Sequence, residues 1–184
     1  MEPLLVTFAG GPTGAWRVER LDPVVGDSVL PVERVAVQEG RGAAAAPAGA
    51  VWALRGTTSN ERYVERPEQD ALAERQPLLG RQEATRAALI PVSKSAAWWE
   101  LAQDERREIL ESRSHHITIG VEYLPAVARR LLHGRDLDEP FDFLSWFEYG
   151  PGGAGAFEEL VGRLRETEEW RYVTREVDIR LARD

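Results

Sequence analysis

The segments of this chain that favour β-strands alternate apolar with polar side chains, and this pattern limits the possible folds more than any other feature. The segment WRYVTREVDIRL (170–181) alternates over its whole length, and FDFLSWFEYG (141–150) alternates with aromatic residues. Strands of this kind keep one face in a core and the other against helices or water, which is typical of antiparallel or mixed sheets. The sequence therefore predicts an α+β fold with helices on one side of the sheet.

The other elements follow from turn residues and from periodicity. Further strands are predicted at 4–11, 15–25, 51–60 and 84–94. Helices are predicted at 67–78, 95–116, 122–134 and 154–169. The small-residue segment 39–50 is expected to be a surface loop. The succession strand–helix–strand around 51–94 and again around 141–181 makes an internal repeat conceivable, although the two segments share no sequence identity.

Composition excludes several classes of protein. The net charge of −8 argues against a nucleic-acid partner, and an anionic substrate would need a local positive group. The absence of cysteine excludes disulfides, thiolate metal sites and cysteine nucleophiles. The N-terminal segment lacks the pattern of a secretory signal, and no stretch approaches the length of a membrane span, so we expect a cytoplasmic protein.

Two of the three histidines are adjacent, in the stretch SRSHHITIG (112–120). Either one of them ligates a metal or cofactor, or both are ordinary polar residues at the end of a helix, where they favour the helix dipole. Spacing alone does not decide between these alternatives.

Three stretches in order along the chain resemble the chlorite dismutase family of haem proteins. They are RGTTSNERYVER (55–66), ALIPVSKSAAWWELAQDERREI (88–109) and FDFLSWFE (141–148). The resemblance extends from about residue 51 to the C-terminus, and the short N-terminal part is similar to the small branch of the family, whose members are usually homodimers. It implies a dimeric α+β barrel of ferredoxin-like repeats. One haem-binding domain, 1–184, would comprise a reduced N-terminal half, 1–94, and a C-terminal half carrying haem, 95–184.

The resemblance also implies the haem ligand. In the family, the proximal histidine lies thirteen residues before the distal arginine, which matches His116 with Arg129, whereas His115 would pair with Ala128. Trp98 lies eighteen residues before His116, or five turns of an unbroken helix, so both would face the same side. The family's acceptor for the ligand's second nitrogen best matches Glu169, although Glu166 and Glu168 are close by.

Further roles come from the same resemblance. Arg129 would hold the anion with a permanent charge, and Gln76 matches a distal glutamine that could bond Arg129. The alternative for each is a solvated surface residue. The family's propionate neighbours match Asn60, Arg62, Tyr63, Lys94 and Trp98, of which Lys94 is the only lysine in the chain. Plain core packing is the alternative for Trp98.

The function implied is a haem b-dependent chlorite dismutase with ferric haem at rest. It converts chlorite to chloride and dioxygen through a ferryl haem and a retained hypochlorite. The alternatives are a coproheme decarboxylase-like or peroxidase-like haem protein of the same fold, a non-catalytic haem-binding protein, or a non-haem barrel. The presence of Arg129 and the short N-terminus argue against the decarboxylase, whose branch lacks that arginine.

Overall fold

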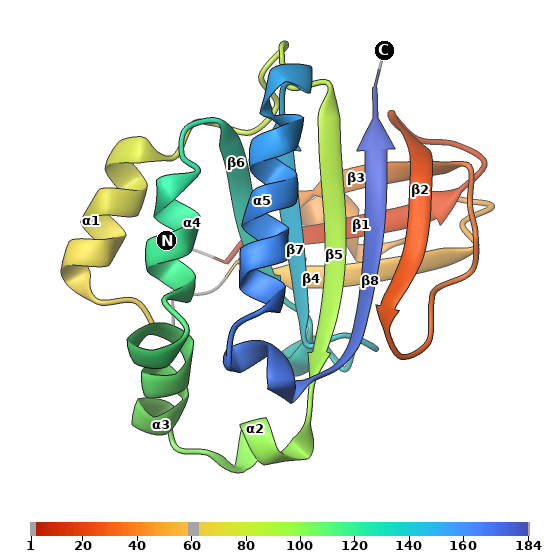
Figure 1. Cartoon of the computed structure of the whole chain (residues 1–184). Coiled ribbons are helices and arrows are strands. Elements are labelled where there is room, and N and C mark those ends of the chain that lie inside the picture. The colour runs from red at the N-terminus through yellow and green to blue at the C-terminus, as the bar shows by residue number, and fades with distance from the viewer. Residues whose placement is uncertain (1–2, 59–62, 184) are drawn as a thin grey trace.

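Eight antiparallel strands close into a barrel in the computed structural model, which describes residues 3–58 and 63–183 (Figure 1). The order around the barrel is β1-β3-β2-β8-β5-β7-β6-β4, and β4 pairs with β1 to close it. The strands are β1 (Leu5–Gly11), β2 (Trp16–Val25), β3 (Arg34–Glu39), β4 (Trp52–Thr57), β5 (Arg86–Lys94), β6 (Val127–His133), β7 (Phe143–Tyr149) and β8 (Val173–Ala182).

The longer helices pack on the outside of this barrel. Figure 1 shows α1, α4 and α5 on the same side of the sheet that contains β5, β7 and β8, so the predicted α+β arrangement is confirmed. The helices are α1 (Arg66–Arg75), α2 (Ala96–Glu100), α3 (Gln103–Arg107), a π-helix (Glu108–Arg113), α4 (His116–Glu122) and α5 (Ala154–Arg165). No helix in the described ranges is both long and apolar enough to cross a membrane.

The two halves of the chain use the same strand order. In the first half β1 lies between β3 and β4, and in the second half β5 lies between β7 and β8. The second half places α2–α4 between β5 and β6, and α5 between β7 and β8. In the first half, the connection between β3 and β4 contains a 3-10 helix, 40–44.

Two apolar clusters form the core. One fills the barrel and includes Phe8, Leu89 and Ile179, which are all at most 1% exposed. The other lies between the outer face of the strands and the helices, where Phe157 and Leu160 of α5 pack against the sheet. The alternation in β8 places Val177, Ile179 and Leu181 in the barrel core, whereas Glu176, Asp178 and Arg180 turn away from it.

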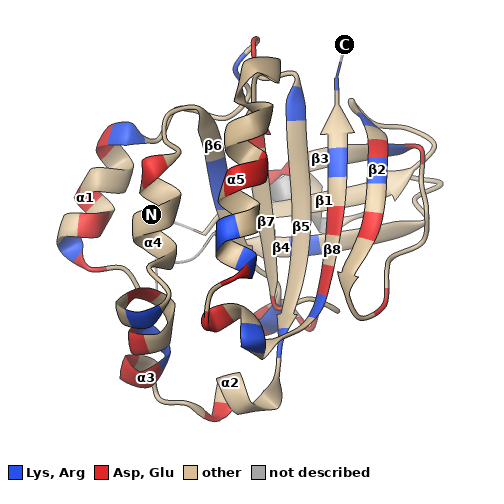
Figure 2. Cartoon of the chain, in the orientation of Figure 1, with Lys and Arg blue, Asp and Glu red and all other residues tan. Residues whose placement is uncertain are grey.

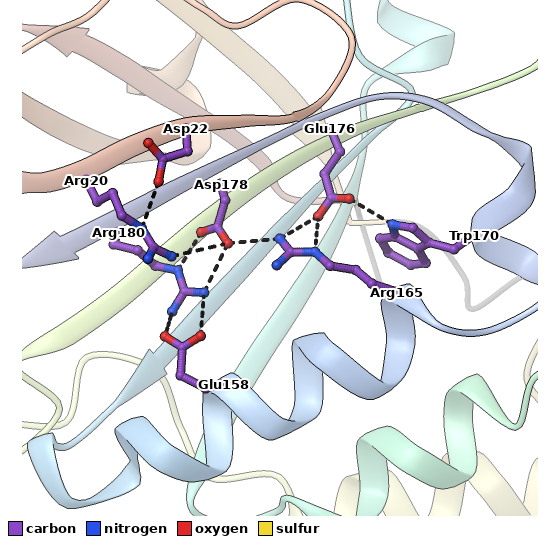
Figure 3. A network of polar contacts seen from close by, with 8 residues as sticks. All are labelled: Arg20, Asp22, Glu158, Arg165, Trp170, Glu176, Asp178 and Arg180. Carbon is purple, nitrogen blue, oxygen red and sulfur yellow. Dashed lines mark hydrogen bonds and ion pairs between the residues drawn. The ribbon is translucent and has the colours of Figure 1, made fainter.

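Glu176, Asp178 and Arg180 of β8 form a largely buried ionic network with α5 (Figure 3), and Figure 2 shows the acidic and basic positions along both elements. The Arg165 guanidinium donates to the carboxylates of Glu176, at 2.7 Å, and Asp178, at 2.9 Å. Arg180 also donates to Asp178, at 2.5 Å, and reaches Glu158 on α5. Burial by itself raises the pKa of Asp178, but the hydrogen bonds and charges of the two arginines lower it overall. The network fixes α5 on the sheet.

The structure corrects two sequence-based predictions and adds one strand. The segment 122–134 is not a helix but contains strand β6, whose residues pair with β7. The predicted helix 95–116 is broken into short helices, with breaks at 101–102 and 114–115, so the five-turn argument that joined Trp98 to His116 is wrong. Strand β3 was not predicted.

Candidate active site

A cavity of about 450 Å³ lies between the helices α1 and α4 and the outer faces of β6 and β7. Most of its lining is apolar, although Leu131, at the middle of β6, remains 51% exposed. An exposed leucine on a sheet face that helices otherwise cover indicates room for an apolar ligand. The apolar residues on its walls include Leu72, Leu110, Ile117, Leu131, Phe143 and Phe147.

His116 begins helix α4 and lines this cavity. Its side chain is 28% exposed, and its Nδ1 lies 2.6 Å from Oε2 of Glu169. When the imidazole is neutral, this carboxylate accepts the proton on Nδ1, and Nε2 then carries the lone pair that a metal ligand needs. His115 differs, because it is exposed and has a left-handed backbone (φ 54°).

Glu169 is buried, with 3% of its surface exposed, and its polar atoms contact polar groups of other residues. One oxygen bonds His116, the other bonds the Lys94 ammonium, and the Glu169 backbone N–H donates to Ser114 Oγ at 2.9 Å. Burial by itself raises the pKa of Glu169, but the charges and hydrogen bonds of His116 and Lys94 outweigh it and lower the pKa to about 2. Glu169 is therefore an ionised acceptor. Of the three acids near this position, Glu168 instead pairs with Arg113.

The start of helix α4 is fixed by a carboxylate that the sequence analysis missed. Glu111 is buried and accepts the backbone N–H of Ile117, at 2.7 Å, and of Thr118, at 3.3 Å, as well as the Thr118 hydroxyl. These are donors that the first turn of a helix leaves unsatisfied. Glu111 lies in the π-helix before α4, among several exposed acids, and no spacing in the sequence distinguishes it from them.

Arg129 lines the cavity from β6, and its guanidinium lies against Gly120 of α4, the helix that carries His116. The Gln76 side-chain amide donates to the Arg129 carbonyl oxygen, so the two distal residues are brought together through the backbone of Arg129. Arg130, which follows on the strand, forms an ion pair with Glu39. His133, the third histidine, also lines the cavity and packs edge-on against Phe143.

The residues matched to propionate neighbours lie at different depths. Tyr63 lines the cavity, and its hydroxyl accepts a hydrogen bond from Arg106 at 3.3 Å. Trp98 and Lys94 do not line the cavity. Trp98 is 1% exposed, and the Lys94 ammonium lies 3.8 Å from the centroid of the Trp98 ring. Lys94 therefore contacts Glu169 and Trp98 rather than lining the cavity. Asn60 and Arg62 lie outside the described residues.

The donor set fits a metal carried by a macrocycle better than a bare ion. Within 3–58 and 63–183 there is no group of three or more histidine, cysteine or acidic side chains that could hold a metal. One neutral imidazole held by a carboxylate is the pattern of a haem iron ligand. A slot with apolar walls on both sides suits a flat, largely apolar group.

Comparison with known proteins identifies the relatives of this chain. The family model for chlorite dismutase matches residues 44–184. The structure is similar to that of a dimeric chlorite dismutase from Nitrobacter winogradskyi, with 56% identity, a TM-score of 0.89 and coverage of 97% of this chain and 99% of that one.

Two more distant matches are also named chlorite dismutase. Chlorite dismutase from Candidatus Nitrospira defluvii, in complex with imidazole, has 18% identity and a TM-score of 0.69, with coverage of 99% of this chain and 92% of that one, which shows the fold alone. Chlorite dismutase of Ideonella dechloratans is 35% identical over 89 residues, which are 48% of this chain and 29% of that protein's length.

Proposed function

The chain belongs to the chlorite dismutase family, and from this premise we propose that it binds haem b and converts chlorite into chloride and dioxygen. The observation that carries the proposal is that His116 of α4 and Arg129 of β6 line one largely apolar cavity. An imidazole that can bind iron and a permanent cation in the same cavity are what an anion-processing haem site needs.

His116 would hold the iron through Nε2, because Glu169 takes its Nδ1 proton. The ionised Glu169 makes the imidazole a stronger donor, and Lys94 keeps that carboxylate charged and in place. Tyr63 would lie beside the edge of the macrocycle, with Asn60 and Arg62 as further propionate donors. Bound haem would supply the redox-active iron for oxygen-atom transfer.

The role of Arg129 would be to hold anions in a protein whose net charge of −8 repels them. Its guanidinium stays charged at every working pH and binds the oxygens of chlorite. The same charge would hold hypochlorite, which remains after chlorite gives up one oxygen atom, in the cavity. Gln76 would support this by fixing the backbone of Arg129.

We further propose that the barrel consists of two ferredoxin-like repeats and forms a homodimer. The repeats are supported by the shared strand order of the two halves. Because β5 pairs with β7 and β8, the division between the halves would fall between β4 and β5, rather than at 94/95 as predicted. The homodimer is supported by the relative from Nitrobacter winogradskyi, which is described as dimeric.

The proposal is tested on purified protein loaded with haem b. We expect a Soret band, and dioxygen release when chlorite is added. Haem binding without dioxygen release would leave a peroxidase-like or non-catalytic haem protein, and decarboxylation of coproheme would favour the decarboxylase. Absence of haem binding would overturn the proposal as a whole.

A further inference from the structure

A second cavity, of about 380 Å³, lies between the core of the barrel and the segment 78–80 that follows α1. Its walls come from β1, β2, β3, β6 and β7 as well as from this segment. Leu78 lines the cavity and is 85% exposed, so the cavity reaches the surface there. Among the described residues, Arg130 alone lines both this cavity and the one that contains His116. The proposed reaction makes no use of the second cavity.

A buried carboxylate faces this second cavity. Glu148 of β7 is 6% exposed and lines the cavity. One of its oxygens accepts the backbone N–H of Gly80 at 2.6 Å, and the other accepts the Nε1–H of Trp146 at 2.9 Å. Its cross-strand neighbours are Ala87 on β5 and Ala128 on β6, whose small side chains leave space beside it. Each oxygen therefore keeps a lone pair that can accept another hydrogen bond.

Glu148 lacks the cationic partner that two other buried acids of this chain have. Glu169 contacts Lys94, and Asp178 contacts Arg165. Within 3–58 and 63–183, Glu148 forms no ion pair, and both of its hydrogen-bond donors are neutral. Moving a carboxylate out of water is costly unless a positive group compensates it. A cationic ligand in the cavity would supply that group.

The walls of the cavity suit an organic cation. Phe8, Trp16 and Trp146 line it as one cluster, in which the Trp146 ring centroid lies 5.2 Å from that of Phe8 and 5.4 Å from that of Trp16. Aromatic faces attract cations and also pack against apolar groups. A metal ion would need several ligating side chains, and the described part of the chain contains no such cluster.

The charges around the cavity favour a monovalent cation. Glu39 and Arg130, the other charged residues of its lining, form an ion pair with each other. The Arg183 guanidinium lies 5.0 Å from the centroid of the Trp16 ring but does not line the cavity. The lining therefore carries one net negative charge, that of Glu148. The net charge of −8 on the whole chain also attracts cations.

We propose that this second cavity binds a small organic cation, a primary ammonium attached to an apolar group. The ammonium would donate to Glu148, and the apolar group would pack against Phe8, Trp16 and Trp146. An ammonium has three N–H donors, so it can bond the remaining lone pairs of the carboxylate while its charge lies beside the rings. A cavity of about 380 Å³ lies within the size range of small-molecule sites. The inference does not depend on haem binding, because the two cavities are separate.

Isothermal titration calorimetry of the purified protein with benzylammonium tests the proposal. Benzyl alcohol is the matched neutral probe, since it has nearly the same size and no charge. Wild type should bind benzylammonium at least about tenfold more tightly than benzyl alcohol, because a hydrogen bond between charged groups is stronger than a neutral one. Glu148→Gln keeps the size of the side chain and removes its charge, so this preference should disappear. Glu159→Gln removes an exposed charge from α5 and should bind both probes like wild type.

Several results would overturn the proposal. They are no binding of benzylammonium, equal binding of the two probes by wild type, and an unchanged preference in Glu148→Gln. The comparison of the two probes on wild type decides the matter even if Glu148→Gln fails to fold.

Two further measurements locate the bound probe. In a crystal structure with benzylammonium, its nitrogen should lie within hydrogen-bond distance of the Glu148 carboxylate, and a nitrogen elsewhere would contradict the assignment. Addition of haem b should leave the affinity for benzylammonium unchanged. Competition between haem and benzylammonium would place the probe in the cavity of His116 and would also overturn the proposal.

Discussion

Two adjacent histidines differ in backbone conformation, and this difference determines which imidazole reaches the cavity. His115 is exposed and adopts a left-handed conformation at the N-cap of α4, two residues after the π-helix ends at Arg113. His116 then begins the helix and meets Glu169. Spacing in the sequence matched His116 and Glu169 to the family, but it gave no indication of the break that separates the two histidines.

Removing each imidazole in turn tests this difference. We expect His116→Ala to bind haem at least tenfold more weakly, because the iron loses its protein ligand, and His115→Ala to bind it like wild type. Titration with hemin, followed at the Soret band, measures both. Normal binding by His116→Ala together with a loss in His115→Ala would show that the ligand is assigned to the wrong residue.

The charge of Arg129 should affect the number of turnovers before inactivation more than it affects haem binding. Arg129→Ala should keep the Soret band and produce fewer molecules of dioxygen per haem before bleaching, because hypochlorite escapes and oxidises the protein. Arg130→Ala is the control, since Arg130 forms its ion pair with Glu39. Dioxygen yield until inactivation measures the effect, and equal yields from Arg129→Ala and wild type would contradict the retention role.

At the scale of elements, strand β6 is the segment whose local sequence predicted the wrong secondary structure. Its residues, VARRLLH, are mostly good helix formers, and the predicted helix 122–134 followed from them. Pairing of β6 with β7 outweighs this propensity, and tertiary contacts of that kind are not visible in a local window. The one local signal against a helix is Pro125, which cannot donate a backbone hydrogen bond.

The capping of α4 by Glu111 should be measurable in stability. Glu111→Ala leaves the N–H groups of Ile117 and Thr118 without their acceptor, so the free energy of unfolding should fall by about 2 kcal/mol. Glu108→Ala, which removes an exposed carboxylate from a surface pair with Arg113, should cost less than about 1 kcal/mol. Urea unfolding of both variants checks this, and equal losses would mean that Glu111 is not a cap.

The network under α5 should give a pH-dependent stability. The folded pKa of Asp178 lies below its ordinary value of 3.8, so its contribution is present at neutral pH and is lost as the pH falls through the folded pKa. Asp178→Asn should lower the unfolding free energy by about 3 kcal/mol at pH 7, and the difference from wild type should shrink below pH about 4. Urea unfolding across this pH range measures it; a constant difference would rule out the ionised carboxylate as the cause.

At the scale of the whole molecule, the alternation of β7 and β8 predicted the α+β class, because each strand separates two cores. The order of strands around the barrel could not be predicted, since it depends on pairings between segments far apart in the chain, such as β1 with β4. The candidate site spans both halves: Gln76 precedes β5, while His116, Arg129 and Glu169 follow it. The pairing of β4 with β6 closes the barrel and brings Gln76 to the cavity that His116 and Arg129 line.

The central claim of the proposed function is that one chlorite anion supplies both atoms of the dioxygen released, because Arg129 would keep the hypochlorite in the cavity. Mass spectrometry of the gas evolved from chlorite labelled with heavy oxygen at both positions, in unlabelled water, tests it directly. We predict doubly labelled dioxygen in an amount equal to the chloride formed. Dioxygen that carries oxygen from water, or chlorite consumption without dioxygen, would contradict the account.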